Sequence, residues 1–182
     1  MTYSEVAKNL RLPLGFVFGI AYLIWARPTA LTLVVGGIIA FIGVLIRAWA
    51  SGHIVKNRRL AVTGPYAHTR NPLYFGSFLI GAGFAVAVHW GLLLVVIGFW
   101  ILVYVPTMER ERKNIRDRFP EEYDVYSANV PAFLPRVIPW AAEGAENGGF
   151  SPSLYMAHGE WKAGITYLLV MSWLAFRVVK GL

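Results

Sequence analysis

The sequence predicts an all-α protein, a polytopic membrane bundle of about five helices. Hydrophobic residues make up 57% of the chain and charged residues only 15%, against roughly 25% charged residues in ordinary soluble domains. The charges are clustered, which leaves long apolar stretches that carry none. These stretches are continuous and do not alternate with polar residues. They therefore favour helices over a barrel, because lipid offers the backbone no hydrogen-bond partners.

The first part of the chain predicts a helical hairpin followed by a polar loop. Residues 12–26 and 29–46 carry no charge, and Arg27-Pro28 separates them. The first stretch is shorter than the about 20 residues that a membrane span needs, so tilt or its flanking residues must compensate. Residues 47–72 bring basic side chains and two proline-containing turns, which predicts an ordered polar loop.

The middle of the chain predicts a second hairpin that continues into an amphipathic helix. Residues 73–88 and 90–108 are again free of charge, and residues 109–130 are strongly charged. Apolar side chains recur at helical spacing where the charged segment begins, so this segment predicts an amphipathic helix that leaves the fourth span. Pro120 ends that helix and begins a second short one, because proline suits the first position of a helix.

The last part of the chain predicts an irregular segment and one more membrane helix. Residues 131–160 are rich in proline and glycine, and residues 163–176 are apolar. Residues 137–182 contain no motif that indicates a function. We expect residues 1–182 to form a single integral membrane domain.

The distribution of basic residues predicts the orientation of the chain in the membrane. With a cytoplasmic N-terminus, the cytoplasmic segments hold all of the 17 Lys and Arg residues except Arg27, Arg177 and Lys180, as the positive-inside rule requires. The polar loop and the amphipathic helix then lie at the cytoplasmic face. There they could enclose a pocket that is open to lipid on one side and to water on the other.

Charge and composition also limit the partners. The net charge of +7 is compatible with nucleic acid or with anionic lipid. We expect membrane lipids and no nucleic acid, because the basic residues flank apolar spans. The chain has no cysteine and four histidines without zinc-type spacing, so the sequence predicts no thiol nucleophile and no metal site.

Residues 60–76 are the most informative stretch. They contain Gly64-Pro65-Tyr66 and Arg70-Asn71-Pro72-Leu73-Tyr74-Phe75-Gly76, which place an arginine between two proline turns ahead of a membrane span. Turns of this kind expose backbone N–H groups, which together with Arg70 can hold a carboxylate or a phosphate. The residues by themselves equally fit an interfacial anchor of Tyr and Arg.

This stretch resembles the isoprenylcysteine carboxyl methyltransferase family and the related small membrane phospholipid methyltransferases. Their pattern is Gly-Pro-Tyr, then Arg-His-Pro-x-Tyr-x-Gly, then a hairpin and an acidic block that ends in Phe-Gly-x-Glu-Tyr-x-x-Tyr. The resemblance covers residues 43–136. The chain departs from the pattern at Asn71, where the family has His, and at Thr107 and Asn129, where it has Arg. The expected cofactor side therefore matches better than the acceptor side.

The resemblance implies an enzyme that transfers a methyl group from S-adenosyl-L-methionine to a lipophilic small molecule or lipid at the membrane surface. Arg70 would pair with a carboxylate of the donor or of the acceptor. Glu111 would hold the donor's ammonium group, orient an arginine or accept a proton. Arg70 and Glu111 are therefore the expected catalytic residues. The residues implied to bind the cofactor are Arg58, Arg59, Leu60, Ala61, Tyr66, Arg70, Asn71, Pro72, Leu73 and Tyr74.

Other functions stay open at this point. They include phospholipid N-methylation and an NADPH-dependent reductase of the sterol reductase type, in which Arg58 and Arg59 would meet the 2′-phosphate. A lipid-binding or structural membrane protein without enzymatic activity is the third possibility. The oligomeric state is not predicted, because a helix face rich in glycine suits a dimer and an internal pocket equally.

Overall fold

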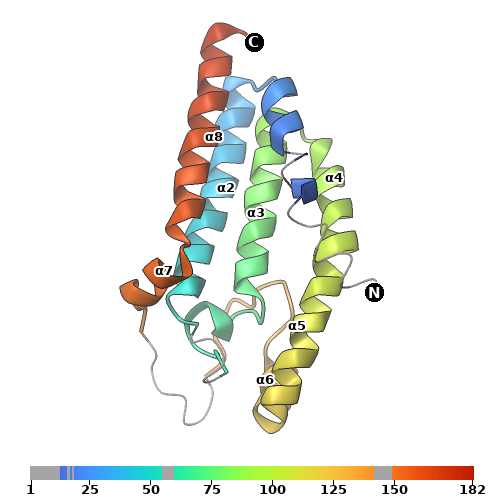
Figure 1. Ribbon diagram of the computed structural model, residues 1–182, viewed down its shortest axis with the longest axis vertical. Helices are drawn as coiled ribbons and strands as arrows, with labels where there is room; N and C mark the ends of the chain where they lie inside the picture. The colour runs from blue at the N-terminus through green and yellow to red at the C-terminus, as the bar shows by residue number, and fades with distance from the viewer. Residues whose placement is uncertain (1–12, 16, 18, 55–59, 142–148) are drawn as a thin grey trace.

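The computed structural model describes residues 13–15, 17, 19–54, 60–141 and 149–182. These residues form helices and irregular segments and contain no strand. Long helices run side by side, and α5 and α6 lie at the end of the bundle opposite the C-terminus (Figure 1). The all-α prediction is confirmed. The elements are α2 (Ala30–Ser51), η1 (Gly64–Ala67), α3 (Pro72–Val88), α4 (Leu92–Phe99), η2 (Trp100–Tyr104), α5 (Val105–Arg118), α6 (Pro120–Asn129), α7 (Pro152–His158) and α8 (Trp161–Lys180).

Several helices have the length and composition of membrane spans. Among the described residues three are long and apolar enough to cross a bilayer, namely Ala30–Ser51, Leu92–Arg118 and Trp161–Lys180. Two shorter apolar helices are Pro72–Val88 and Pro13–Trp25, and the latter runs over residues outside the described set. The prediction of a helical membrane protein is confirmed. The number of crossings stays a prediction.

The fourth predicted span and the amphipathic helix form one continuous helix, Leu92–Arg118. Pro106 lies inside it, and proline removes one backbone donor and crowds the carbonyl group four residues earlier. The π-helical turn η2 ends at Tyr104, two residues before Pro106, and such a turn widens the helix where the regular ladder is interrupted. The predicted amphipathic helix is thus confirmed as α5, and α6 begins at Pro120 as predicted.

The contact between α2 and α3 depends on glycines whose backbones nearly touch. A Cβ added to Gly43 would lie 2.5 Å from the carbonyl oxygen of Gly76, and one added to Gly83 would lie 2.5 Å from that of Gly36. Small residues allow helix axes to come this close. This contact fixes the start of α3, which carries part of the candidate site.

Two predicted boundaries are wrong. The sequence predicts that residues 47–72 form a loop, but α2 continues to Ser51 and includes Arg47. The helix can continue because the guanidinium group of Arg47 finds partners on α3 and next to α8. The sequence also predicts that residues 131–160 are irregular, whereas residues 152–158 form α7, whose first turn is capped by the side chain of Ser151.

Candidate functional site

Two polar segments that are far apart in the sequence meet at one end of the bundle (Figure 1). The hydroxyl of Tyr126 in α6 donates a 2.7 Å hydrogen bond to the carbonyl oxygen of Tyr66 in η1. The backbone N–H of Arg70 donates a 2.9 Å hydrogen bond to the carbonyl oxygen of Pro131. These bonds hold the segment after α2 against the segment after α5.

A cavity of about 390 Å³ lies between the two segments, and we call it the polar pocket. Several residues expected to bind the cofactor or to act in catalysis line it together. Its lining also contains arginines and tyrosines that the sequence analysis did not include, namely Arg112, Arg118, Tyr123 and Tyr126. The predicted residues in the lining are Leu60, Ala61, Tyr66, Arg70, Asn71 and Glu111.

Of the remaining predicted residues, Pro72, Leu73 and Tyr74 do not line the polar pocket. Pro72 is fully buried at the start of α3, and the carbonyl oxygen of Leu73 accepts hydrogen bonds from Arg47 and Ser77. Tyr74 donates a hydrogen bond to Glu111, a lining residue, as described below. Arg58 and Arg59 lie outside the described residues.

Arg70 is held by α6. Its Nη1 donates a 3.0 Å hydrogen bond to the hydroxyl of Tyr123, and its guanidinium carbon lies 5.8 Å from the centre of the same ring. Its Nε is buried and has no hydrogen-bond partner among the residues that the structure describes. Arg70 therefore keeps an unused donor in a fixed position.

Tyr66 carries a second unused donor. Gly64 starts the turn η1 with a φ of 58°, a conformation that favours glycine, and the turn buries Tyr66. The Tyr66 hydroxyl is buried and lacks a partner within the described residues. Burial, and then the nearby carboxylates of Glu160 and Glu111, raise the pKa of Tyr66 well above its usual value. The hydroxyl therefore stays protonated and remains a donor.

Two carboxylates on α5 have separate partners. The hydroxyl of Tyr74 donates a 2.8 Å hydrogen bond to Oε1 of Glu111. Arg112 Nε donates a 2.8 Å hydrogen bond to Oε2 of Glu109, one turn away. Glu111 is therefore oriented by α3 at the edge of the polar pocket, and Glu109 compensates the charge of Arg112.

The electrostatic character of the polar pocket suits an anion or a zwitterion. Arg70, Arg112 and Arg118 line it together with one carboxylate, Glu111. In the described part of the chain, no three His, Asp or Glu side chains are grouped so that they could hold a metal ion. Carboxylates and phosphates are the groups that arginine binds in a bidentate manner, whereas divalent cations prefer carboxylate oxygen or imidazole nitrogen.

A second, apolar cavity of about 530 Å³ lies beside α3, between the first apolar helix and the α4–η2 segment. Its lining includes Tyr22, Phe84 and Trp100, and it reaches Tyr104. The ring of Tyr104 packs against the ring of Tyr74 at 5.7 Å. Tyr74 thus stands between the apolar cavity and the polar pocket.

Comparison with known proteins gives two relatives with similar names. The chain is 27% identical over 151 residues to the nickel-cobalt-cadmium resistance protein NccN of Alcaligenes xylosoxydans xylosoxydans, a match over 80% of this chain and 68% of that protein. It is 32% identical over 124 residues to the cobalt-zinc-cadmium resistance protein CzcN of Cupriavidus metallidurans, over 65% of this chain and 55% of that protein. The chain thus spans little more than half of the second relative. No family model and no solved structure matches it.

These relatives correct the functional prediction. They are named for metal resistance and not as isoprenylcysteine carboxyl methyltransferases. The predicted family and the predicted methyl transfer are therefore wrong, and phospholipid N-methylation and the sterol-type reductase are left without support. The physical reason is that the matching residues also serve local structure. Gly64 supplies a positive φ, Pro72 starts α3 and Tyr126 closes onto Tyr66.

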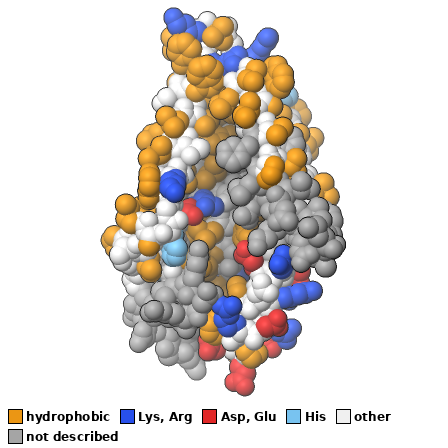
Figure 2. Space-filling model, viewed as in Figure 1, with side chains coloured by type: hydrophobic (Ala, Val, Ile, Leu, Met, Phe, Trp, Pro, Cys, Tyr) orange, Lys and Arg blue, Asp and Glu red, His pale blue; other side chains and the backbone are white. Residues whose placement is uncertain are grey.

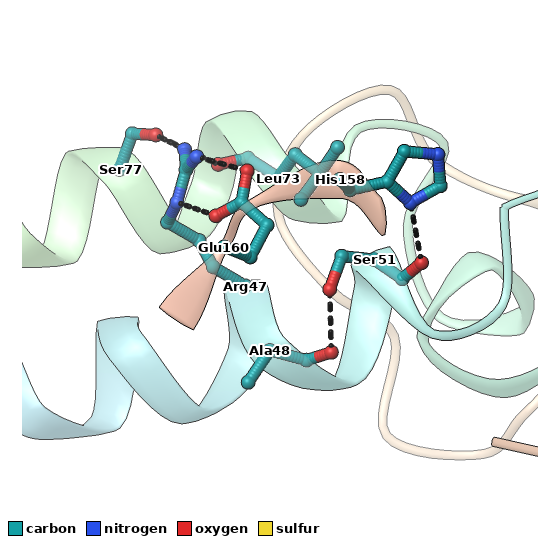
Figure 3. A network of polar contacts seen from close by, with 7 residues as sticks. All are labelled: Arg47, Ala48, Ser51, Leu73, Ser77, His158 and Glu160. Atoms are coloured by element: carbon teal, nitrogen blue, oxygen red, sulfur yellow. Dashed lines mark hydrogen bonds and ion pairs between the residues drawn. The ribbon is translucent and has the colours of Figure 1, made fainter. Parts of the chain in front are cut away.

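Sequence reasoning missed a partly buried ion pair between α2 and the residue that precedes α8 (Figure 3). Arg47 Nε and Nη2 donate hydrogen bonds of 2.9 and 2.7 Å to the two carboxylate oxygens of Glu160. Arg47 Nη1 donates to the hydroxyl of Ser77 and, at 3.3 Å, to the carbonyl oxygen of Leu73. A signal for this pair was present in the sequence. Arg47 is a lone charge at the end of an apolar stretch, and such a charge requires a partner.

Proposed function

We propose that this protein contributes to cellular resistance to divalent metal cations of the group nickel, cobalt, cadmium and zinc. The similarity to two proteins named for such resistance, one of them matched over 80% of this chain, carries the proposal. The three helices that are long and apolar enough to cross a bilayer fit a role at the membrane, where cells control the entry and exit of metal ions.

We further propose that the polar pocket is the functional site and that it binds an anionic or zwitterionic small molecule rather than a bare metal ion. Its lining has three guanidinium groups and one carboxylate, and with Arg112 compensated by Glu109 the remaining two arginines still disfavour a free cation. The unused donors of Tyr66 and Arg70 support the same ligand class, because a buried donor without a partner costs about 1–3 kcal/mol. An acceptor-rich ligand would remove this cost.

The predicted enzymatic role and the predicted cofactor stay proposals of a narrower kind. S-adenosyl-L-methionine carries a carboxylate on its amino-acid end, and Arg70 and Tyr66 could bind that group. It is one member of the proposed ligand class, and the pocket residues do not select it over other carboxylates or phosphates.

We also propose five membrane crossings, with the polar pocket at the cytoplasmic face. The support is the distribution of Lys and Arg together with the five apolar helices. Because the chain has no cysteine, single substitutions Lys113→Cys and Lys180→Cys can be labelled with a membrane-impermeant maleimide in intact cells. Lys180→Cys should react, and Lys113→Cys should react only after permeabilisation. Labelling of both in intact cells contradicts this topology.

Growth on metals tests the function directly. The protein is expressed in a metal-sensitive bacterial strain, and growth is measured over a range of nickel, cobalt, cadmium and zinc concentrations. The unchanged chain should raise the tolerated concentration of at least one of these metals. Arg70→Gln and Glu111→Gln should lose the effect, whereas Arg116→Gln, an exposed residue of α5 outside the pocket lining, should keep it.

The outcomes of this assay test the resistance function and the assignment of the polar pocket separately. Growth equal to that of the empty vector overturns the resistance function. Full resistance in both pocket variants, at equal amounts of membrane-inserted protein, overturns the assignment of the polar pocket as the functional site. Immunoblots of membrane fractions provide the control for expression.

Thermal unfolding of the purified protein in detergent tests the ligand class. A ligand that binds the folded state raises the melting temperature by mass action. S-adenosyl-L-methionine, a dicarboxylate and inorganic phosphate are compared with nickel chloride, each with the unchanged chain and with Arg70→Gln. We expect at least one anionic compound to stabilise only the unchanged chain. Stabilisation by nickel alone contradicts the proposal.

A further inference from the structure

The end of the bundle opposite the polar pocket carries three basic side chains and, in the described ranges, no Asp or Glu, so the acidic group there is the terminal carboxylate of Leu182. Arg27 lies between the first apolar helix and α2, and Arg177 and Lys180 lie in the last turn of α8. At this tip the visible face shows Lys and Arg side chains and no Asp or Glu (Figure 2). In the described ranges none of these three cations forms an ion pair.

A cavity of about 530 Å³ lies at this end, lined by Arg27, Pro28, Arg177, Val178, Gly181 and Leu182. Arg27 and Arg177 thus line one space, together with apolar residues. The cavity has room for many atoms, since one water molecule takes roughly 30 Å³ in the liquid. Two guanidinium groups facing a shared space provide a binding geometry for the oxygens of a phosphate group.

Arg177 is fixed in position before any ligand binds. Its Nη1 donates hydrogen bonds to the carbonyl oxygens of Leu23 at 3.1 Å and Ile24 at 2.7 Å, which lie at the end of the first apolar helix. Its Nε is buried without a partner in the part of the chain that the structure describes. Because a guanidinium group has five N–H donors, Arg177 retains donors for a further acceptor.

Tryptophan side chains gather near this end of the bundle. Trp25 and Trp90 are 73% and 71% exposed, and Trp173 donates a 3.0 Å hydrogen bond to the carbonyl oxygen of Leu23. Thr32 donates a hydrogen bond to the carbonyl oxygen of Ala87, which holds the start of α2 beside the end of α3. Tryptophan is enriched at membrane–water interfaces, so in a bilayer this end would lie close to the lipid phosphate groups.

We propose that Arg27 and Arg177 form a binding site for the phosphate group of an anionic phospholipid. An inorganic phosphate ion has the same charged oxygens. The lipid is the occupant we assign, because its acyl chains can pack against the apolar helix surfaces below the cavity while its phosphate meets the two guanidinium groups. The site is separate from the polar pocket, and the inference does not depend on the proposed function.

Binding is measured with the purified full chain in a neutral detergent, by native mass spectrometry and by melting temperature. The probes are phosphatidylglycerol, phosphatidylcholine and inorganic phosphate at equal concentrations. Phosphatidylglycerol should be retained on the protein and should raise the melting temperature, with an affinity about tenfold higher than that of phosphatidylcholine. Equal binding of both lipids overturns the proposal, and equal stabilisation by inorganic phosphate reassigns the site to a soluble anion.

Variants locate the site. Arg27→Gln removes an exposed side chain and should lower the affinity for phosphatidylglycerol about tenfold without changing the fold. Arg27→Lys should restore part of it, since lysine keeps the charge but not the planar fork. Lys180→Gln is the matched control, because Lys180 lies on the same end but does not line the cavity. If Lys180→Gln weakens binding as much as Arg27→Gln, general surface charge explains the effect and the proposed site does not exist.

Discussion

The hydroxyl of Tyr74 donates a 2.8 Å hydrogen bond to Oε1 of Glu111, 37 residues further along the chain. This bond joins the first turn of α3 to the polar part of α5. The same tyrosine ring packs against Tyr104, which lines the apolar cavity. One residue therefore connects the polar pocket with a cavity formed among the apolar helices.

Replacing Tyr74 by phenylalanine tests this connection. Tyr74→Phe keeps the ring contact and removes the hydrogen bond, so Glu111 loses the group that orients it. We expect a loss of roughly 1 kcal/mol in the free energy of unfolding and a clear loss of metal tolerance in the growth assay. Tyr155→Phe, in α7 and away from the pocket, serves as the control. If Tyr74→Phe has the tolerance of the unchanged chain, the orientation of Glu111 has no part in the function.

The pair Arg47–Glu160 should contribute more to stability than an exposed pair. Their side chains are 24% and 15% exposed, so Glu160→Gln leaves a charge that is largely removed from water. We expect a loss of about 2 kcal/mol, below the 3–5 kcal/mol of fully buried pairs. Asp124→Asn breaks the pair Arg116–Asp124, whose side chains are 54% and 55% exposed, and should cost about 0.5 kcal/mol. Thermal unfolding in detergent measures both, and equal losses contradict the prediction.

A methyl group between α2 and α3 should separate these helices. In Gly43→Ala the new Cβ lies 2.5 Å from a backbone oxygen of Gly76, which cannot move without a shift of α3. We expect a loss of about 1–3 kcal/mol. Gly98→Ala in α4 meets no atom within 4 Å and should be neutral or slightly stabilising. A stable, fully folded Gly43→Ala variant would show that the two helices are less tightly packed than the structure indicates.

Two buried tyrosines should respond in opposite directions to the loss of their hydroxyl groups. Tyr126→Phe leaves the carbonyl oxygen of Tyr66 without its buried donor and should lower the free energy of unfolding by about 1–3 kcal/mol. Tyr66→Phe removes a buried hydroxyl without a described partner. It should therefore keep or raise stability while weakening the binding of the proposed anionic ligand. Destabilisation of equal size in both variants contradicts the assignment of an unused donor to Tyr66.

Alkaline pH should destabilise the fold through the same tyrosines. Burial is the main cause that raises the pKa of both Tyr66 and Tyr126, whereas unfolded tyrosines ionise near pH 10. Folding therefore favours the protonated hydroxyls, and their contribution is complete below about pH 10 and is lost as the pH rises further. Above about pH 10, the melting temperature should fall more steeply with rising pH in the unchanged chain than in Tyr66→Phe. Parallel curves contradict the prediction.

Local sequence features predicted much of the architecture. The apolar stretches, the amphipathic α5 and the start of α6 at Pro120 depend on residues close together in the chain, so composition and spacing reveal them. The turn around Gly64 also followed from the sequence. The proximity of Arg70 to the later acidic segment followed from the topology, because two hairpins bring both segments to one end of the bundle.

Contacts between distant residues could not be predicted in this way. Arg47 and Glu160 are 113 residues apart, and only the packing of α8 beside α2 brings them together. The bond between Arg70 and Tyr123, 53 residues later, could not be predicted for the same reason. The functional prediction failed because short patterns of Gly, Pro, Tyr and Arg describe turns and helix starts that proteins of different function share.

The sequence alone determined that this protein is built from apolar helices with most of its charges in the segments between them and near their ends, because solvation by lipid or water depends on each segment's own composition. The tertiary structure decided which charges find partners. It pairs Arg47 with Glu160 and Arg70 with Tyr123, and it leaves Arg27 and Arg177 without a described Asp or Glu partner. These pairings depend on distances between helices, and such distances are set only when the side chains of the whole bundle pack together.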